Sequence, residues 1–416
     1  MASGCTSASA NNIVVDFGEN LSGWVKLFVK GKAGTTVTLR HAEVLQHPPY
    51  GPANGEIYTG NLRTAQATDV YILKGDPNGE IFEPHFTYHG FQYVEVIGYP
   101  GTLTADNITQ IHFRTLSRVR TTFNSSSPIL NAIQINALKG QGSNMMSVPT
   151  DCDQRDERLG WMGDADLSAD SFAINYDFAA FQDGFLLNMA DAQPNDGSLP
   201  DVVPFMRYGG RPGDVSWSAA LPQNVYVRYK VNGDLQPAQR FWGVLSSYFD
   251  NLASQFQKAE GNFQKWNTPY GDWVPAGPKV ANQLCTGFNY IVNARQMIEL
   301  ATALNRTADA QKYAALVSQL TEAYNAAFYH QDRNCWDNCV QSAYAMSLVA
   351  GVAPQSAQAP ALNALINDIV TTQKNHVTVG IIGAKALFSI LQSTGHVQIG
   401  VDLAEQTTQV SHLHEI

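Results

Sequence analysis

The feature that most constrains the fold of this 416-residue chain is a change of sequence pattern near residue 120. Before that point, short runs of β-branched and aromatic residues are separated by Gly, Pro and Asn turns, at the spacing typical of an antiparallel sandwich. The run from Trp24 to Lys30 alternates apolar and polar residues, which predicts a strand with one face in solvent. We therefore predict a β-sandwich domain over residues 1–120.

The second part of the chain, residues 121–416, has a helical pattern. A polar stretch at residues 124–128 can cap the first helix, and long segments with a 3.6-residue apolar period follow it. The predicted helices are residues 128–146, 165–192, 214–231, 235–256, 280–305, 308–328, 338–350, 360–372, 381–392 and 397–408. Such an array of helical hairpins is shared by bundles, solenoids and closed (α/α) barrels, and no repeat of about 30 to 47 residues favours a solenoid.

The charge balance excludes several classes of partner. The 36 acidic residues outnumber the 26 Lys and Arg residues, and the net charge of −10 argues against a nucleic-acid or anionic-membrane surface. No uninterrupted apolar run approaches the roughly 18 residues of a membrane span. The first residues lack the pattern of an export signal, yet glycosylation sequons begin at Asn107, Asn124 and Asn305, so secretion and a cytoplasmic location both stay open.

The cysteines and histidines do not predict a metal site. The five cysteines are odd in number and scattered, which fits neither a disulfide framework nor a four-ligand zinc site. Cys335 and Cys339 could close a small loop, but free thiols are the expected state. Because the ten histidines are equally dispersed, we predict no metal and no other cofactor.

A loop between two predicted helices carries the strongest functional signal. Residues 150–164 read TDCDQRDERLGWMGD and hold five carboxylates, two arginines and a tryptophan, in a chain of which only 15% is charged. Most charged stretches are solvated faces. Gly160, Trp161 and Gly163 do not suit such a face, and a second long acidic loop at residues 193–212 follows, so a functional interpretation is the stronger one.

Crowded carboxylates suit the cleavage of a glycosidic bond. That reaction needs one carboxylic acid that stays protonated and a second carboxylate that activates water or attacks as a nucleophile. Neighbouring negative charges keep one acid protonated, while Arg155 and Arg158 hold others ionised. A single tryptophan is usually a core residue, but four near polar loops suggest a sugar-binding cleft: Trp161, Trp217, Trp266 and Trp273.

The segment PTDCDQRDERLGWMGDA, residues 149–165, resembles the signature D-C-x-Q-R-D-E-R-x-G-W-x-G-D of inverting (α/α)6-barrel α-L-rhamnosidases from bacteria and fungi. The resemblance extends upstream through VVDFGENLSGWVKLFVKG, GNLRTAQATDVYILKG and FEPHFTYHGFQYVEVIGYPG, and downstream through PYGDWV and HVTVGIIGAKAL. It implies an antiparallel β-sandwich followed by an (α/α)6 barrel. It also implies inverting hydrolysis of terminal α-L-rhamnose from glycosides or polysaccharides.

The resemblance further implies roles for individual residues. Glu157 would be the general acid. The residues that would bind the sugar or tune that acid are Asp151, Arg155, Trp161, Asp164, Trp217, Asp272 and Trp273. The tryptophans would line the pocket for the C6 methyl group, since an aromatic wall favours a methyl and leaves a C6 hydroxyl unpaired.

The chain also departs from the family pattern. The family's general base lies in a G-A-T-T-x-W-E segment that this sequence does not contain, and neither Glu405 nor Glu415 sits in such a motif. We therefore expect a chain truncated at both ends, with an incomplete barrel and without a step that contributes about 10²–10⁴-fold in rate. The alternatives are a catalytically impaired rhamnose-binding homologue, a gene fragment, and an (α/α)6 enzyme for another sugar.

Overall fold

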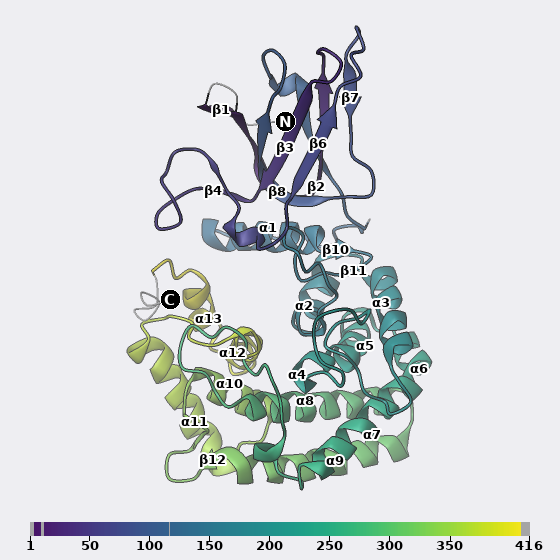
Figure 1. The fold of residues 1–416 in the computed structure, drawn as a ribbon. Helices are drawn as coiled ribbons and strands as arrows, with labels where there is room; N and C mark the ends of the chain where they lie inside the picture. Colours follow the sequence, from purple (N-terminus) through teal and green to yellow (C-terminus); the bar gives the residue numbers. More distant parts are fainter. Residues whose placement is uncertain (1–3, 10–11, 116, 409–416) are drawn as a thin grey trace. The chain divides into compact units, whose positions relative to one another are not determined.

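The computed structural model describes residues 4–9, 12–115 and 117–408. Contacts within the chain define two compact units (Figure 1). The strand unit comprises Met1–Ser117 and Ala132–Gly160, and the helical unit comprises Arg118–Asn131 and Trp161–Ile416. Most of the acidic loop therefore belongs to the strand unit, whereas Trp161 and the residues after it belong to the helical unit.

The strand unit is an antiparallel sheet structure in which one long strand joins the others. Its strands are β1 (Gly4–Ser9), β2 (Asn12–Val29), β3 (Thr36–Ala42), β4 (Val44–Leu45), β5 (Ile57–Tyr58), β6 (Thr68–Ile72), β7 (Glu80–Phe82), β8 (His89–Ile97), β9 (Ile108–His112), β10 (Met145–Met146) and β11 (Val148–Pro149). The main sheet has the order β1-β2-β8-β3-β6, and β7 and β9 also pair with β2. A register shift between Asp16 and Leu21 divides β2, so its first half pairs with β1 and its last residues pair with β7 and β9.

The alternation predicted for residues 24–30 is confirmed. Val25, Leu27 and Val29 are buried in the core of the strand unit, while Lys26 and Lys30 are exposed. An antiparallel pair with one buried face produces this pattern, because successive side chains of a strand point to opposite faces. The prediction of an antiparallel sheet domain that precedes a helical domain is confirmed.

The helical unit contains a ring of helices. Its elements are α2 (Met162–Asn175), α3 (Ala179–Ala192), α4 (Val215–Ser218), α5 (Ala220–Asn232), α6 (Gln236–Arg240), α7 (Trp242–Lys258), α8 (Asn282–Ala303), α9 (Thr307–Phe328), β12 (Tyr329–His330), β13 (Cys335–Trp336), α10 (Gln341–Ala350), α11 (Gln355–Asn367), α12 (Ile381–Ser393) and α13 (Val397–Ala404); α1 (Pro128–Ser143) begins in this unit and ends in the strand unit. Helices α2, α5, α8, α10 and α12 each contact the next, and α12 contacts α2, which closes the ring. Helices such as α3, α9 and α11 pack outside it and bury one face only.

Several predictions for the helical unit are wrong. The predicted helices 214–231 and 235–256 are each divided, into α4 and α5 and into α6 and α7. Residues 165–192 form two helices, because the backbone becomes extended at Tyr176 and bridges Val119, and Asp177 N donates to Arg118 O at 2.7 Å. The apolar period continues across this break, so the sequence pattern does not reveal it. Cys335 and Cys339 form a disulfide, where free thiols were expected.

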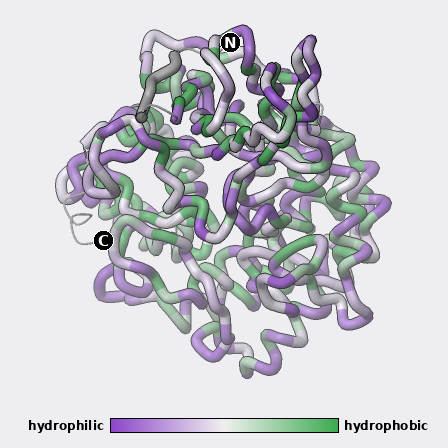
Figure 2. Tube along the Cα trace, turned by 45° about the horizontal axis from the view of Figure 1, so that its top comes forward, coloured by the Kyte–Doolittle hydropathy of each residue, from purple (hydrophilic) through white to green (hydrophobic). Residues whose placement is uncertain are grey.

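Polar and apolar residues are interleaved along the chain at short intervals (Figure 2). Among the described residues, we find no helix with the length and apolar character needed to cross a membrane.

Candidate active site

The acidic loop is closed by the side chain of Asp151. Its Oδ1 accepts a hydrogen bond from Leu159 N at 2.8 Å, and Asp151 N donates to Leu159 O at 3.0 Å. Its Oδ2 accepts from Arg155 Nη2 at 3.1 Å. The carboxylate is almost completely buried, so much of its hydrogen-bonding capacity is used to hold the loop in shape.

Glu157 lies against the segment that follows β5. Arg63 Nη1 donates to Glu157 Oε1 in an ion pair, and the hydroxyl of Thr64 donates to Asp156 Oδ2. Arg63 has a positive φ of 57° directly after the short 3-10 turn Gly60–Leu62, and its backbone N–H donates to Gly60 O. The Arg63 side chain is 52% exposed whereas that of Glu157 is 13% exposed, so the acid is held by a partner that solvent can reach.

Other residues of the loop fix its base on the strands. The guanidinium of Arg158 lies 4.3 Å from the ring centre of Tyr88, and Arg158 N donates to the sulfur of Cys152 at 3.4 Å. Asp153 is buried against Gly90, where an added Cβ would lie 2.5 Å from Asp153 Oδ1. Burial, followed by the negative charge of Glu43, raises the pKa of Asp153 to about 6. Burial therefore contributes more than neighbouring charges to the raised pKa of Asp153, and this acid packs against the strands.

In the helical unit, three tryptophan rings gather around Tyr270. The ring centroid of Tyr270 lies 4.4 Å from that of Trp217, 5.8 Å from that of Trp273 and 6.2 Å from that of Trp161. Trp217 is buried, while Trp273 is 46% exposed. The indole N–H of Trp217 has no hydrogen-bond partner among the described residues, so a buried donor is left at the centre of this aromatic cluster.

Two buried aspartates support the aromatic cluster. Asp201 accepts hydrogen bonds from Tyr270 Oη at 2.9 Å and from Asp214 N at 2.6 Å. Asp214 in turn caps α4 by accepting from Ser216 N at 2.8 Å, and it accepts a bond from Tyr270 N at 3.2 Å. Burial raises the pKa of Asp201 and also raises that of Tyr270, so the phenol stays protonated as a donor.

Asp272 anchors the start of α12. Its Oδ1 accepts from Ile382 N at 3.0 Å and Gly383 N at 2.9 Å. Its Oδ2 accepts from Gly380 N at 2.8 Å and from the hydroxyl of Ser342 at 2.6 Å. The side chain is fully buried. With four donors on two oxygens, the carboxylate holds a helix N-terminus and places the neighbouring Trp273.

A half-open cavity of about 480 Å³ lies among the helices of the ring and has both apolar and polar lining residues. Lys385 Nζ lies 2.9 Å from Asp170 Oδ2 and donates to Asp166 O at 3.1 Å. Burial raises the pKa of Asp166 to about 6, against the charge of Lys385, which lowers it. A second cavity of about 630 Å³ lies beside Tyr270 and is lined by Asp201 and Asp214.

The predicted site residues fall into two groups. Asp151, Arg155 and Glu157 lie in the strand unit, and Trp161, Asp164, Trp217, Asp272 and Trp273 lie in the helical unit. Trp217 and Trp273 come together as neighbours in the aromatic cluster, with centroids 6.3 Å apart, and Asp164 is exposed in the first turn of α2. Trp266, expected near a cleft, packs instead in a core with Phe256, Phe263 and Tyr290.

Sequence reasoning missed Arg63 and Tyr270 as functional candidates. Both stand in segments that the resemblance covers, GNLRTAQATDVYILKG and PYGDWV, but no local pattern singles them out. Arg63 is distinguished by its contact with Glu157, 94 residues away, and Tyr270 by its bond to Asp201, 69 residues away.

Comparison with protein families gives two adjacent matches. The bacterial α-L-rhamnosidase concanavalin-like domain matches residues 6–114, and the bacterial α-L-rhamnosidase six-hairpin glycosidase domain matches residues 118–416. Among curated proteins, an α-L-rhamnosidase of Streptomyces avermitilis is 34% identical over 402 residues, which are 95% of this chain and 37% of that protein. An α-L-rhamnosidase of an Alteromonas species is 29% identical and is matched over 98% of this chain and 44% of its own length.

Solved structures agree with these matches. An α-L-rhamnosidase from Dictyoglomus thermophilum superposes with a TM-score of 0.91 at 32% identity, covering 98% of this chain and 45% of that one. The Streptomyces avermitilis α-L-rhamnosidase complexed with L-rhamnose gives a TM-score of 0.89 at 33% identity, covering 98% and 38%. The chain thus spans less than half the length of these relatives, and the predicted fold class, a β-sheet domain followed by an (α/α)6-type helical domain, is confirmed.

Proposed function

The chain belongs to the bacterial α-L-rhamnosidase family, and on this premise we propose that it acts in the inverting hydrolysis of terminal α-L-rhamnosides with Glu157 as the general acid. The observation that carries the proposal is the difference between the carboxylates of the acidic loop. Asp151 holds the loop closed and Asp153 is packed against the strands, whereas Glu157 is held by the half-exposed Arg63. Of these three, Glu157 is the acid whose partner can move into solvent.

The chemistry follows from that arrangement. Glu157 donates a proton to the glycosidic oxygen while the bond from this oxygen to the anomeric carbon breaks, and the leaving alcohol departs neutral. In the same step, a water molecule attacks the anomeric carbon from the opposite face and loses its proton to a base. Arg63 neutralises Glu157 in the absence of substrate, and it must move aside before the carboxyl can carry a proton toward the sugar.

The sugar-binding roles are proposed within each unit separately. In the strand unit, Arg155 presents guanidinium donors to sugar hydroxyls, while Asp151 keeps Arg155 in place. In the helical unit, Trp217, Trp273 and Tyr270 offer aromatic surfaces to the C–H faces and the methyl group of a deoxysugar.

The remaining roles in the helical unit are less direct. Trp161 completes the aromatic surface, and Asp164 offers an exposed carboxylate to hydroxyls. We assign Asp272 a positioning role, because its oxygens already accept hydrogen bonds from four donors. The buried Trp217 N–H is a donor to which an oxygen of the ligand can bind.

The test compares Glu157→Gln with wild type on two substrates, p-nitrophenyl α-L-rhamnoside and an alkyl α-L-rhamnoside. Loss of a general acid costs about 10²–10⁴-fold, and the loss should be larger for the alkyl substrate, whose poor leaving group needs the proton more. Glu322→Gln, at an exposed position of α9, is the matched control and should leave both rates unchanged. An equal loss on both substrates contradicts the acid role of Glu157.

The same proteins distinguish the enzyme from a binding homologue. Calorimetric titration of the wild-type chain with L-rhamnose gives binding in either case, but only the enzyme releases sugar from the rhamnosides. Binding without turnover by wild type would favour the binding homologue.

A further inference from the structure

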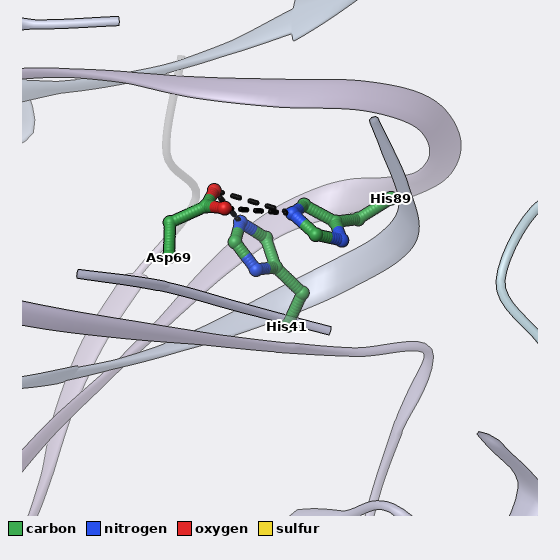
Figure 3. Close-up of side chains that lie close together, drawn as sticks. All are labelled: His41, Asp69 and His89. Carbon is green, nitrogen blue, oxygen red and sulfur yellow. Dashed lines mark hydrogen bonds and ion pairs between the residues drawn. The ribbon is translucent and has the colours of Figure 1, made fainter. Parts of the chain in front are cut away.

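Three side chains from three neighbouring strands meet in the strand unit. They are His41 on β3, Asp69 on β6 and His89 on β8 (Figure 3). The Asp69 carboxylate lies between the two histidines. His89 Nε2 lies 3.2 Å from both of its oxygens, and His41 Nε2 lies 3.9 Å from its Oδ2. The two imidazole rings stack with centroids 4.0 Å apart, so both rings present one nitrogen to the same carboxylate.

The hydrogen bond on the far side of His41 fixes its tautomer. His41 Nδ1 lies 3.0 Å from the carbonyl oxygen of Ala67, and a carbonyl can only accept, so Nδ1 carries the proton. In the neutral ring, Nε2 then holds a lone pair that points toward Asp69. This nitrogen has no hydrogen-bond partner among the described residues, and His41 is only 1% exposed.

The cluster therefore has too many acceptors for the protons it holds. His89 Nε2 can donate to Asp69, but a lone pair on His41 Nε2 faces a carboxylate in a site where the histidines are at most 6% exposed. Among the described residues, the ion pairs of Asp69 are with these two histidines and include no Lys or Arg. The other ring nitrogen of His89, Nδ1, has no hydrogen-bond partner among the described residues. It therefore does not indicate which nitrogen of His89 carries the proton. A cation between the three side chains would satisfy all the facing lone pairs.

We propose that His41, Asp69 and His89 bind a divalent transition-metal ion, with Zn²⁺ as the ion that this ligand set favours. One atom from each residue lies within 4.8 Å of the others. Two ligands of one tetrahedral zinc ion lie about 3.3–3.6 Å apart, because zinc bonds to nitrogen and oxygen are about 2.0–2.2 Å long, so modest side-chain shifts complete the site. Two imidazoles and a carboxylate leave the fourth position of a tetrahedral ion to water.

The surroundings of the cluster orient and shield its side chains. The Nδ1–H bond to a backbone carbonyl orients His41 as such bonds orient metal-bound histidines in general. The edge of Phe91 packs on the His41 ring with centroids 4.7 Å apart and closes one side. A bound ion would join β3, β6 and β8. The histidines are dispersed along the chain and so did not predict a metal site, but strand pairing brings residues 41, 69 and 89 together.

The first experiment measures zinc binding by the full 416-residue chain, purified without a histidine tag and stripped with EDTA. Titration with Zn²⁺ against a chromophoric chelator should give one ion per chain, and the thermal midpoint should rise on zinc addition. His41→Gln and Asp69→Asn should weaken binding by at least about 10-fold. His47→Gln, an exposed histidine in the same unit, should bind zinc as wild type does.

A second measurement does not depend on variants that fold poorly. Zinc X-ray absorption on the wild-type chain should show two imidazole ligands and oxygen ligands at about 2.0–2.2 Å. No zinc binding by the stripped wild type overturns the proposal. So does a folded His41→Gln protein with unchanged affinity, or a zinc spectrum with sulfur ligands. In those cases the cluster is a hydrogen-bonded network of the strand unit.

Discussion

Replacing Asp272 by Asn tests whether this carboxylate anchors α12. An asparagine keeps the size of the side chain but has one acceptor oxygen and one NH2 group. The oxygen can keep two of the four donors, Ile382 N and Gly383 N, if the NH2 group faces Gly380 N and the hydroxyl of Ser342. The hydroxyl can rotate to accept from the NH2 group, but Gly380 N–H is then left buried without an acceptor.

The expected cost follows from these contacts. A buried donor without a partner costs about 1–3 kcal/mol, and loss of a negative charge at a helix N-terminus costs about 0.3–2 kcal/mol more. The free energy of unfolding of the helical unit should therefore fall by about 1.3–5 kcal/mol. A larger local rearrangement is blocked, because an added Cβ at Gly380 or Gly383 would already lie within 2.7 Å of an Asp272 oxygen, which shows how closely the segment packs.

The assay is urea unfolding followed by far-UV circular dichroism at pH 7, where the helices dominate the signal. Asp332→Asn, at an exposed position of the same unit, is the matched control and should change the free energy of unfolding by less than about 0.5 kcal/mol. A loss below about 1 kcal/mol for Asp272→Asn, or a loss equal to that of the control, would refute the anchoring role and restore a direct sugar contact as the better explanation.

Two further substitutions test the helical unit. The pKa of Asp166 is raised by burial from 3.8 to about 6, so its contribution to stability is full below pH 3.8 and is lost as pH rises through about 6. Asp166→Asn should therefore raise the free energy of unfolding by up to about 3 kcal/mol at pH 7.5 and by little at pH 4, and equal urea midpoint shifts at both pH values would contradict this. Gly163→Ala should lower the free energy of unfolding by about 1–3 kcal/mol, because the added Cβ would lie 2.6 Å from the buried Trp217 ring. Gly184→Ala, on α3 with no heavy atom within 4 Å of the added Cβ, should not destabilise the protein, and an equal loss in both variants would argue against the contact with Trp217.

The sequence predicted the buried face of a strand better than it predicted where the helices end. The alternation at Val25, Leu27 and Val29 indicates which face of β2 is buried. This pattern depends only on residues that are neighbours in the sequence. The break between α2 and α3 is not local. Tyr176 leaves the helix because its backbone bridges Val119, a residue that precedes it by more than fifty positions. A period of 3.6 residues detects the buried face on both sides of such a break but not the break itself.

The candidate site divides in the same way. The density of acids in residues 150–164 predicted a functional loop, and the Trp217 and Trp273 rings do meet in one cluster. The partners that decide how these residues behave come from distant segments. Arg63 on Glu157 and Tyr270 between the tryptophans depend on the tertiary fold, as do the histidines that meet at Asp69.

The structure separates two kinds of residue that a motif match treats alike. In PYGDWV and HVTVGIIGAKAL, Asp272 takes four donors while Gly380 and Gly383 leave room for its oxygens, so these three residues form one packing unit. In the acidic loop, Asp151 likewise spends its carboxylate on loop closure. A carboxylate already saturated by backbone donors cannot also bind a sugar hydroxyl without loss of those bonds. Substitution of such a residue should therefore reduce stability and activity together, whereas Glu157→Gln should reduce activity alone. Measurements of the thermal midpoint and of the hydrolysis rate on the same variants distinguish the two cases.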